Sequence, residues 1–504
     1  MMQKLLIAYL LTPIGRITEK ISDKGRDALF LLGGLGLVVH FFAHNMQLDN
    51  YRFLVYFAIN CVFMGLMLLG SLSGTIHPVK FHKPMAFFWF GAAALTTLSG
   101  LTQSSSYLPD GVLMLVILPV LYICWCNQDR QHILGLLLKI CRISLMIFLV
   151  VSFLLAEITQ KKYSGLFSNP NNASYYLAVV SVALIAEILY AEKKTHLVWD
   201  ILLLAAATAM DYYTNSRSGP LAVFCAVGLG VSIYLLTHKR QDNFRCLLRL
   251  CAGAAASVIC ISSLLYVFQL RDFLPLPYYN VQTQELYLSP RWESLYHPDP
   301  APSGPSTPNT PNTPSTPNTP STPNTPNTPS DPATPSKPGT DFFGTDGFEN
   351  LNQEKTEIGD KTADSFSTGR ISIWKAYAKD LNLWGHESTP AVYIDILQRD
   401  ITSTHMTILQ VGYESGIIAG ILYLLMNLTS GICTILFAWK HRSEKYALMP
   451  LMITVTFGVL SMLGSCHVAF WHWTTIMYYF VLFPIMAAVP SQPKLSAEKA
   501  LEKQ

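Results

Sequence analysis

The chain has 504 residues, of which 51% are hydrophobic and only 13% are charged, and its formal net charge is +3. A typical soluble domain carries about 25% charged residues, so this composition argues against a single soluble domain. The small net charge and the lack of a basic block argue against a nucleic-acid-binding protein.

Long apolar stretches predict an all-α polytopic membrane protein, because about 20 mostly apolar residues are needed to cross the hydrocarbon core. The apolar stretch at residues 4–11 is too short to span and lacks the cleavage site of a signal peptide. About twelve membrane-spanning helices are predicted, of which the seventh is short. The predicted spans are 28–44, 53–70, 85–101, 111–126, 140–157, 173–191, 197–210, 219–237, 247–269, 416–438, 446–464 and 473–489.

The Lys and Arg residues predict the orientation, because cytoplasmic loops carry an excess of basic residues. With the N-terminus inside, the inside segments hold 22 Lys and Arg, whereas the short outside segments hold only Arg52, Lys161, Lys162 and Arg217. Both termini are therefore expected in the cytoplasm, with the long loop 271–415 outside, between helices nine and ten. All ten cysteines lie in or next to predicted spans, so no external disulfide framework is indicated.

The external loop separates two predicted membrane regions, 1–270 and 416–504, and has three parts. Residues 271–297 form its start. Residues 298–339 are rich in Pro, Thr, Asn and Ser, with proline at every third position, which is the period of polyproline II; they predict a disordered or semi-rigid tether. Residues 340–415 return to ordinary composition and predict a small structured external cap.

Within this cap, a short amphipathic helix is predicted over Ser372–Leu383, with Ile373, Trp374, Tyr377 and Leu381 on one side. A second short helix is expected at Asp395–Arg399. The external loop carries 9 basic and 17 acidic residues, whereas the rest of the chain carries 26 basic and 15 acidic residues. The small net charge is therefore a balance between a basic membrane region and an acidic loop.

Four polar patches are candidates for a functional site, and the first is GLFSNPNNA at 165–173. Its residues Asn169, Asn171 and Asn172 lie at the mouth of the sixth predicted span, where they could line a site. Asn is also a common helix cap, so Asn171 or Asn172 could simply start the span.

The second patch contains Ser216 and Arg217, in the predicted external turn between spans seven and eight. An Arg there lies outside the positive-inside pattern and could hold a phosphate, although a snorkelling interfacial Arg is the alternative. The third patch contains Arg370, two residues after the possible helix cap Thr368. A cation in the first turn opposes the helix dipole, so Arg370 indicates an anion site rather than helix stabilisation, unless it is a solvated surface residue.

The fourth patch contains His405, followed by Glu414 and by Gly416 and Gly420, just before span ten. An imidazole titrates near neutral pH and can take a proton from a hydroxyl, although a single His is more often structural. The two glycines are spaced as a helix-packing pair. No ligand set for a metal and no glycine-rich phosphate loop is found, so neither a metal nor another cofactor is predicted.

Together the patches resemble the O-antigen ligase and O-antigen polymerase superfamily of bacterial envelope glycosyltransferases. The resemblance rests on the order and placement of four segments over residues 140–490, together with the twelve-span plan and its large external loop. These segments are GLFSNPNNAS (165–174), NSRSGPLA (215–222), STGRISIW (367–374) and HMTILQVGYESGIIAG (405–420).

The resemblance implies a multi-pass enzyme of the bacterial cytoplasmic membrane that transfers a glycan from a polyprenyl-pyrophosphate donor, with inversion and without a metal. It implies that His405 is the catalytic base and that Arg217 and Arg370 bind the donor pyrophosphate. The acceptor stays open: a polymerase extends a second lipid-linked glycan, whereas a ligase acts on a lipid, wall polymer or protein.

Two other classes of function stay open from the sequence. Twelve spans also suit a transporter or a flippase for lipid-linked glycans, although no internal repeat is evident and Glu157, Glu187 and Asp200 fall near span ends. A non-catalytic scaffold could use the Pro-rich tether to bind partners. Deletion of 300–339 would separate that role from an enzyme, which should survive the deletion.

Overall fold

The structure is a computed structural model. It describes residues 2–48, 53–72, 74, 76–103, 108–156, 163–271, 273–280, 285–287, 370–394, 399–466 and 472–486. The tether at 298–339 lies outside the described residues, as do Arg52, Glu157, Thr368 and most of the predicted start of the external loop.

The described chain is mainly helical, as the apolar stretches predict. A continuous N-terminal helix consists of α1 (Met2–Leu6), the π-helix η1 (Ile7–Leu11) and α2 (Thr12–Thr18). The other helices are α3 (Asp23–Asn45), α4 (Phe53–Ser71), α5 (Lys83–Thr102), α6 (Leu108–Val112), η2 (Leu113–Ile117), α7 (Leu118–Trp125), α8 (Arg130–Leu155), α9 (Pro170–Tyr190), α10 (Lys194–Thr214), α11 (Ser218–Thr237), α12 (Arg240–Arg271), α15 (Arg370–Lys379), α16 (Thr407–Ser415), α17 (Ile417–Lys440), α18 (Met449–Leu463) and α19 (Trp473–Met486).

Within the described residues, eight helices are long and apolar enough to cross a membrane, which supports a membrane-embedded all-α protein. They correspond to α3, α5, α6–α7, α8, α9, α11, α12 and α17, and three shorter apolar helices lie in α4, α18 and α19. The seventh predicted span coincides with α10, which belongs to neither group and carries the buried Asp200 and Asp211. Each of the twelve predicted segments thus falls on a helix, although α8 and α12 begin well before their predicted spans.

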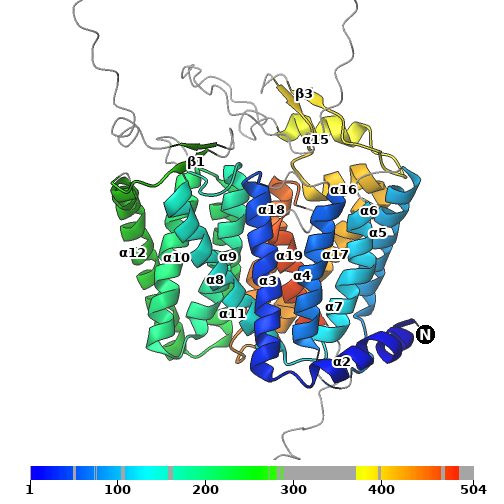
Figure 1. Cartoon of the computed structure of the whole chain (residues 1–504), viewed down its shortest axis with the longest axis horizontal. Coiled ribbons are helices and arrows are strands. Elements are labelled where there is room, and N and C mark those ends of the chain that lie inside the picture. The colour runs from blue at the N-terminus through cyan, green and yellow to red at the C-terminus, as the bar shows by residue number, and fades with distance from the viewer. Residues whose placement is uncertain are drawn as a thin grey trace, which may run out of the picture.

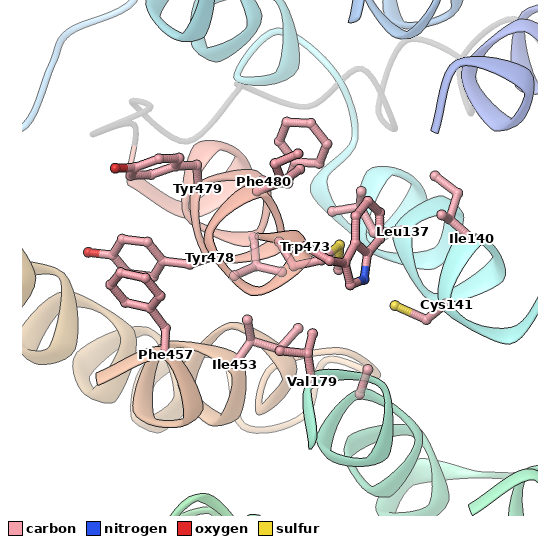
Figure 2. Close-up of a cluster of buried hydrophobic side chains, with 14 of the residues drawn as sticks. Leu137, Ile140, Cys141, Val179, Ile453, Phe457, Trp473, Tyr478, Tyr479 and Phe480 are labelled. Carbon is pink, nitrogen blue, oxygen red and sulfur yellow. The ribbon is translucent and has the colours of Figure 1, made fainter. Parts of the chain in front are cut away.

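Helix α9 lies at the centre of the bundle and α12 at its edge. In α9, 94% of the most apolar window is buried, against 11% in α12. Figure 2 shows α9 meeting α8, α18 and α19 around a cluster of buried apolar side chains. In that cluster Phe457 stacks on Tyr478 with ring centroids 4.1 Å apart. This packing holds α9 and α18 together, and both helices reach the end of the bundle that carries the candidate site.

The two ends of the bundle carry different elements (Figure 1). At one end lie α15 and two antiparallel hairpins, in which β1 (Tyr278–Asn280) pairs with β2 (Glu285–Tyr287) and β3 (Val392–Ile394) pairs with β4 (Arg399–Ile401). We call this the cap end. The N-terminal helix lies across the opposite end, which we call the N-helix end.

The cap confirms one predicted helix and corrects another. Helix α15 runs from Arg370, two residues before the predicted start, to Lys379, four residues before the predicted end, so Leu381 lies beyond it. It buries Ile373 and Tyr377 as expected. The predicted helix at Asp395–Arg399 is wrong at Arg399, which begins strand β4, while residues 395–398 lie outside the described residues. The alternating segment around Val392 supplies a partner strand, so hairpin pairing replaces local helix formation there.

A buried ionic network joins α8, α9 and α10 near the N-helix end. The Arg142 guanidinium donates to both carboxylate oxygens of Asp200, over 2.7 and 2.6 Å. It also lies 3.6 Å from Glu187, which pairs with Lys445 over 2.9 Å. Two cations therefore balance two buried carboxylates, as burial in a low-dielectric bundle requires.

Candidate functional site

The start of α9 forms the first part of the site. The Asn169 side chain accepts a hydrogen bond from the backbone N–H of Asn171 over 2.8 Å, so Asn169 is the helix cap. The expectation that Asn171 or Asn172 starts the span is therefore wrong. The reason is that Pro170 occupies the first helical position, where its missing N–H costs nothing.

With Asn169 as the cap, the Asn171 and Asn172 side chains are free to bind other segments. Asn171 Oδ1 accepts a hydrogen bond from Ser216 Oγ over 3.0 Å. Asn172 Nδ2 donates to Asn45 Oδ1 over 3.0 Å, and Asn45 is buried at the end of α3. The first two polar patches of the sequence therefore touch each other directly.

The turn between α10 and α11 presents Arg217 to solvent. Helix α10 ends at Asn215 in the left-handed conformation, with a φ of 56°, and α11 starts at Ser218. Ser216 Oγ lies 3.0 Å from Ser218 Oγ, which ties the turn to the helix start. The exposed Arg217 guanidinium forms no ion pair with any other described residue, so it is available to an anion.

Gly219 lets this turn pack closely on α9. A Cβ atom at Gly219 would lie 2.0 Å from Ser174 Oγ and 3.1 Å from Asp211 Oδ1. Both of these oxygen atoms are buried, and the Asp211 carboxylate lies close to the Ser174 hydroxyl. A buried carboxylate and a buried hydroxyl therefore lie directly beneath the turn that carries Arg217.

Arg370 approaches the same region from the cap. It is the first residue of α15 and is half-buried, and it forms no ion pair with the rest of the described chain. Its charge acts on the hydroxyl of Tyr175, and Gly219 at the start of α11 lies against the adjacent Ser174. Arg370 and the start of α11 therefore both lie beside the first turns of α9, although 152 positions separate Arg370 from Arg217.

The residues around Tyr377 hold α15 in place. The Tyr377 hydroxyl donates to the carbonyls of Pro390 and Ile401, over 2.7 and 3.0 Å. Burial raises the pKa of the Tyr377 phenol to about 12, so it stays a hydrogen-bond donor at neutral pH. These bonds join α15 to the segment that leads to His405.

His405 lies in a tight loop before α16. It is half-buried and has a φ of 50°, a left-handed conformation uncommon for a residue other than glycine. The Ser403 hydroxyl accepts a hydrogen bond from the His405 N–H over 3.3 Å, and the Thr404 N–H donates to Gln410 Oε1 over 2.8 Å. The backbone of the loop is thus held by short-range hydrogen bonds at Thr404 and His405.

The segment after α18 anchors this loop to the bundle. Thr407 Oγ1 donates to the carbonyl of Gly464 over 2.8 Å, and Ser403 Oγ lies 2.8 Å from Ser465 Oγ. The Tyr175 hydroxyl donates to the neighbouring carbonyl of Leu463 over 3.4 Å. Tyr175 therefore links the His405 loop with Arg370 and, through the adjacent Ser174, with the start of α11.

Glu414 supports the His405 loop from a buried position and does not face an open surface. Its Oε1 atom accepts a hydrogen bond from Gln410 Nε2 over 2.5 Å, and its backbone carbonyl accepts one from Ser99 Oγ over 2.9 Å. Gln410 also donates to Thr389 Oγ1 over 2.9 Å. Glu414 and Gln410 thus join the loop, the cap and α5.

The glycines near Glu414 serve packing in two different ways. Gly416 has a φ of 94°, and a Cβ there would lie 2.1 Å from the carbonyl oxygen of Leu383. Gly416 therefore belongs to a turn rather than to a helix-packing pair. Gly420 does pack against a helix, because its Cβ would lie 2.8 Å from the Cα of Gly412 in α16.

Two residues of the site, Tyr175 and Asn45, are not among the polar patches of the sequence. Tyr175 lies within an apolar span, and Asn45 ends α3 far from the other patches. The polar character of Asn45 at a span end is the one signal that could have drawn attention to it. Tyr175 gives no such signal, because an aromatic residue in a span is ordinary.

The site combines two arginines that have no carboxylate partner among the described residues, the start of α11 and a His-bearing loop. Helix N-termini and guanidinium groups both favour a bound anion. Among the described residues, no group of three His, Cys, Asp or Glu side chains is placed to hold a metal ion. No model of a known protein family matches the chain, and a search of curated proteins found no match either.

Proposed function

We propose that the protein transfers a glycan from a polyprenyl-pyrophosphate donor to an acceptor hydroxyl, as a surface-polysaccharide polymerase or an O-antigen-type ligase. One observation carries the proposal. Arg217, Arg370 and His405 belong to three distant segments that meet at the cap end through Tyr175 and the segment around Gly464.

The proposed reaction is an inverting displacement. The acceptor oxygen forms a bond to the anomeric carbon, and the bond between that carbon and the pyrophosphate oxygen breaks. His405 takes the hydroxyl proton as the general base. Arg217 and Arg370 stabilise the negative charge on the departing lipid pyrophosphate, which is the charge a metal ion would neutralise in other transferases.

The proposed topology follows from the basic residues. All twelve bundle helices would span the cytoplasmic membrane of a bacterium, with both termini inside and residues 271–415 outside. The cap end would then face outward, where it could receive flipped lipid-linked glycans. Membrane lipids would surround the bundle, and no cofactor or nucleic acid would take part.

The test compares variants of the three residues with a matched control. His405→Ala, Arg217→Ala and Arg370→Ala should each abolish high-molecular-weight surface glycan in cells that depend on this protein. Lys375→Ala should leave it intact, because Lys375 is an exposed cation on the same helix as Arg370. Immunoblots of the membrane fraction must show equal amounts of each variant.

Two further results would sharpen the test. Arg370→Lys should restore glycan only in part, since an ammonium group cannot form the paired hydrogen bonds of a guanidinium. Normal glycan in all three alanine variants would overturn the proposal.

A transporter or flippase of lipid-linked glycans is a second candidate, and Asp211 favours it. This carboxylate is buried and forms no ion pair with any other described residue, and ionisable groups of this kind mark ion pathways in transporters. The balanced pairing of Glu187 and Asp200 with cations speaks against a wider charge relay. Reconstituted vesicles separate the two functions, because a flippase would move the labelled donor without joining two glycans.

A further inference from the structure

A short loop of the cap exposes two neighbouring apolar side chains. Leu383 and Trp384 follow α15, and their side chains are 58% and 70% exposed. Contact between apolar surface of this size and water is unfavourable. A surface that covers both side chains would therefore stabilise the loop.

Hydrogen bonds within the loop fix the position of its backbone. The Asn382 side-chain oxygen accepts hydrogen bonds from the backbone N–H groups of Trp384 and Gly385, over 2.8 and 2.6 Å. Gly385 has a φ of 86°, and a Cβ atom there would lie 2.1 Å from the carbonyl oxygen of Glu414. The loop is thus packed against the end of α16, and the exposed side chains project from a fixed backbone.

Two further hydrogen bonds place the loop where α5 ends and α17 begins. Gln103, directly after α5, donates from its side-chain Nε2 to the carbonyl of Trp384 over 2.9 Å. Ile417, the first residue of α17, donates from its backbone N–H to the carbonyl of Asn382 over 2.9 Å. Both helices are long and apolar enough to cross a membrane. The loop therefore lies at the level where two membrane-spanning helices end, which is the level of the membrane–water interface.

The loop also borders the apolar outer surface of these two helices. Helices α5 and α17 pack closely, since a Cβ atom at Gly91 would lie 2.9 Å from Leu422 Cδ1. Their turns nearest the cap end expose four apolar side chains, which face lipid in a membrane: Leu98, Leu101, Ile418 and Ile421. The exposed loop is thus continuous with a lipid-facing surface.

We propose that Leu383 and Trp384 insert into the interfacial layer of the bilayer and anchor the cap to the membrane surface. Tryptophan is enriched at this depth, because its ring is apolar while its indole N–H can bond to headgroups and water. The occupant of the exposed surface is therefore lipid. The inference depends on the membrane location of the bundle and is independent of the proposed glycan transfer.

The experiment uses the full chain in nanodiscs of phosphatidylcholine whose acyl chains carry bromine near the headgroup. Bromine quenches the emission of tryptophans in contact with lipid, whereas iodide in the buffer quenches tryptophans in contact with water. Trp384→Phe should reduce the emission intensity that brominated lipid quenches and leave the iodide-quenched intensity unchanged. Trp473→Phe is the matched control, because Trp473 is 1% exposed and its loss should reduce neither quenched intensity.

Leu383→Asp gives a second check, because a carboxylate is unfavourable in the bilayer. This variant should lower the lipid-quenched intensity and raise the iodide-quenched intensity. Leu286→Asp places the same charge on the exposed side chain of β2 and should change neither.

Two outcomes would overturn the proposal. If Trp384→Phe removes iodide-quenched emission instead, the loop lies in water. If Trp384→Phe changes neither quenched intensity, protein covers the loop, either another segment of this chain or a second copy of it.

Discussion

The two ends of the helix bundle differ in whether their charged side chains form ion pairs. Toward the N-helix end, Asp200 and Glu187 are buried and each is paired with a cation. At the cap end, Arg217 and Arg370 form no ion pairs within the described residues, and the buried Asp211 lies beside Ser174 without a cation. Paired charges stabilise a fold, whereas unpaired arginines are available to a ligand. The N-helix end is thus stabilised by internal ion pairs, whereas the two arginines of the cap end have no ionic partner among the described residues.

The largest expected effect comes from breaking the buried network. Arg142→Met leaves Asp200 buried without its guanidinium partner and should lower the free energy of unfolding by about 3–5 kcal/mol. Thermal unfolding of the purified protein in detergent measures it. Arg245→Met is the control, because Arg245 is 61% exposed and its pair with Asp242 is long, at 3.9 Å. Similar melting temperatures for the two variants would contradict the expectation that the buried ion pair contributes more stability than the exposed one.

A smaller change in the free energy of unfolding is expected at the cap end, where helices α9 and α11 pack closely around Gly219. Gly219→Ala places a methyl group against Ser174 and Asp211 and should destabilise the protein by about 1–3 kcal/mol. Gly228→Ala in the same helix has open space around the new methyl group. It should be neutral or stabilising by up to about 1 kcal/mol. Opposite signs for the two variants in thermal unfolding would support the close approach of α9 and α11; equal effects would not.

The pH dependence of the N-helix end should be smaller still. Burial opposes ionisation of Glu444, but hydrogen bonds and charge from Arg130 and His441 outweigh it and hold the pKa of its carboxyl below the ordinary value. Ionised Glu444 therefore stabilises the folded state above its unfolded pKa, about 4.3, and this stabilisation is lost as the pH falls through the folded pKa.

Melting curves over a pH series check this expectation. Wild-type protein and Glu444→Gln should differ most near neutral pH and converge in acid. Glu192→Gln, which removes an exposed carboxylate, should show no such convergence. If the difference in melting temperature between wild type and Glu444→Gln stays the same in acid, the stabilisation does not depend on the negative charge of Glu444.

The smallest effect on stability should come from the candidate site itself. Arg217→Gln and Arg370→Gln should change the free energy of unfolding by no more than about 0.5 kcal/mol, because neither arginine has an ionic partner in the described chain. The measurement is the same thermal unfolding used for Arg142→Met. A loss comparable to that of Arg142→Met would give these arginines a structural role.

Much of the fold could be predicted because the signal for a membrane helix is local. All twelve predicted apolar segments coincide with helices, including α10, whose short apolar stretch gave the weakest signal. Arg399, which is predicted to end a short helix, instead begins strand β4, since four or five residues do not distinguish the two structures without their partner strand. The cap of α9 is Asn169 rather than Asn171 or Asn172, and the sequence alone does not decide this because three asparagines in this short stretch can each cap a helix.

The sequence by itself determined that the chain is helical and apolar, because each residue's hydropathy is fixed before any contact forms. The sequence also identifies polar residues next to the apolar segments, such as Arg217, Arg370 and His405. Only the tertiary structure decided which of them meet. Ser99 donates to Glu414 across 315 positions, and Tyr175 joins segments that no periodicity connects. Such contacts depend on how whole helices pack, and that packing is a property of many residues together.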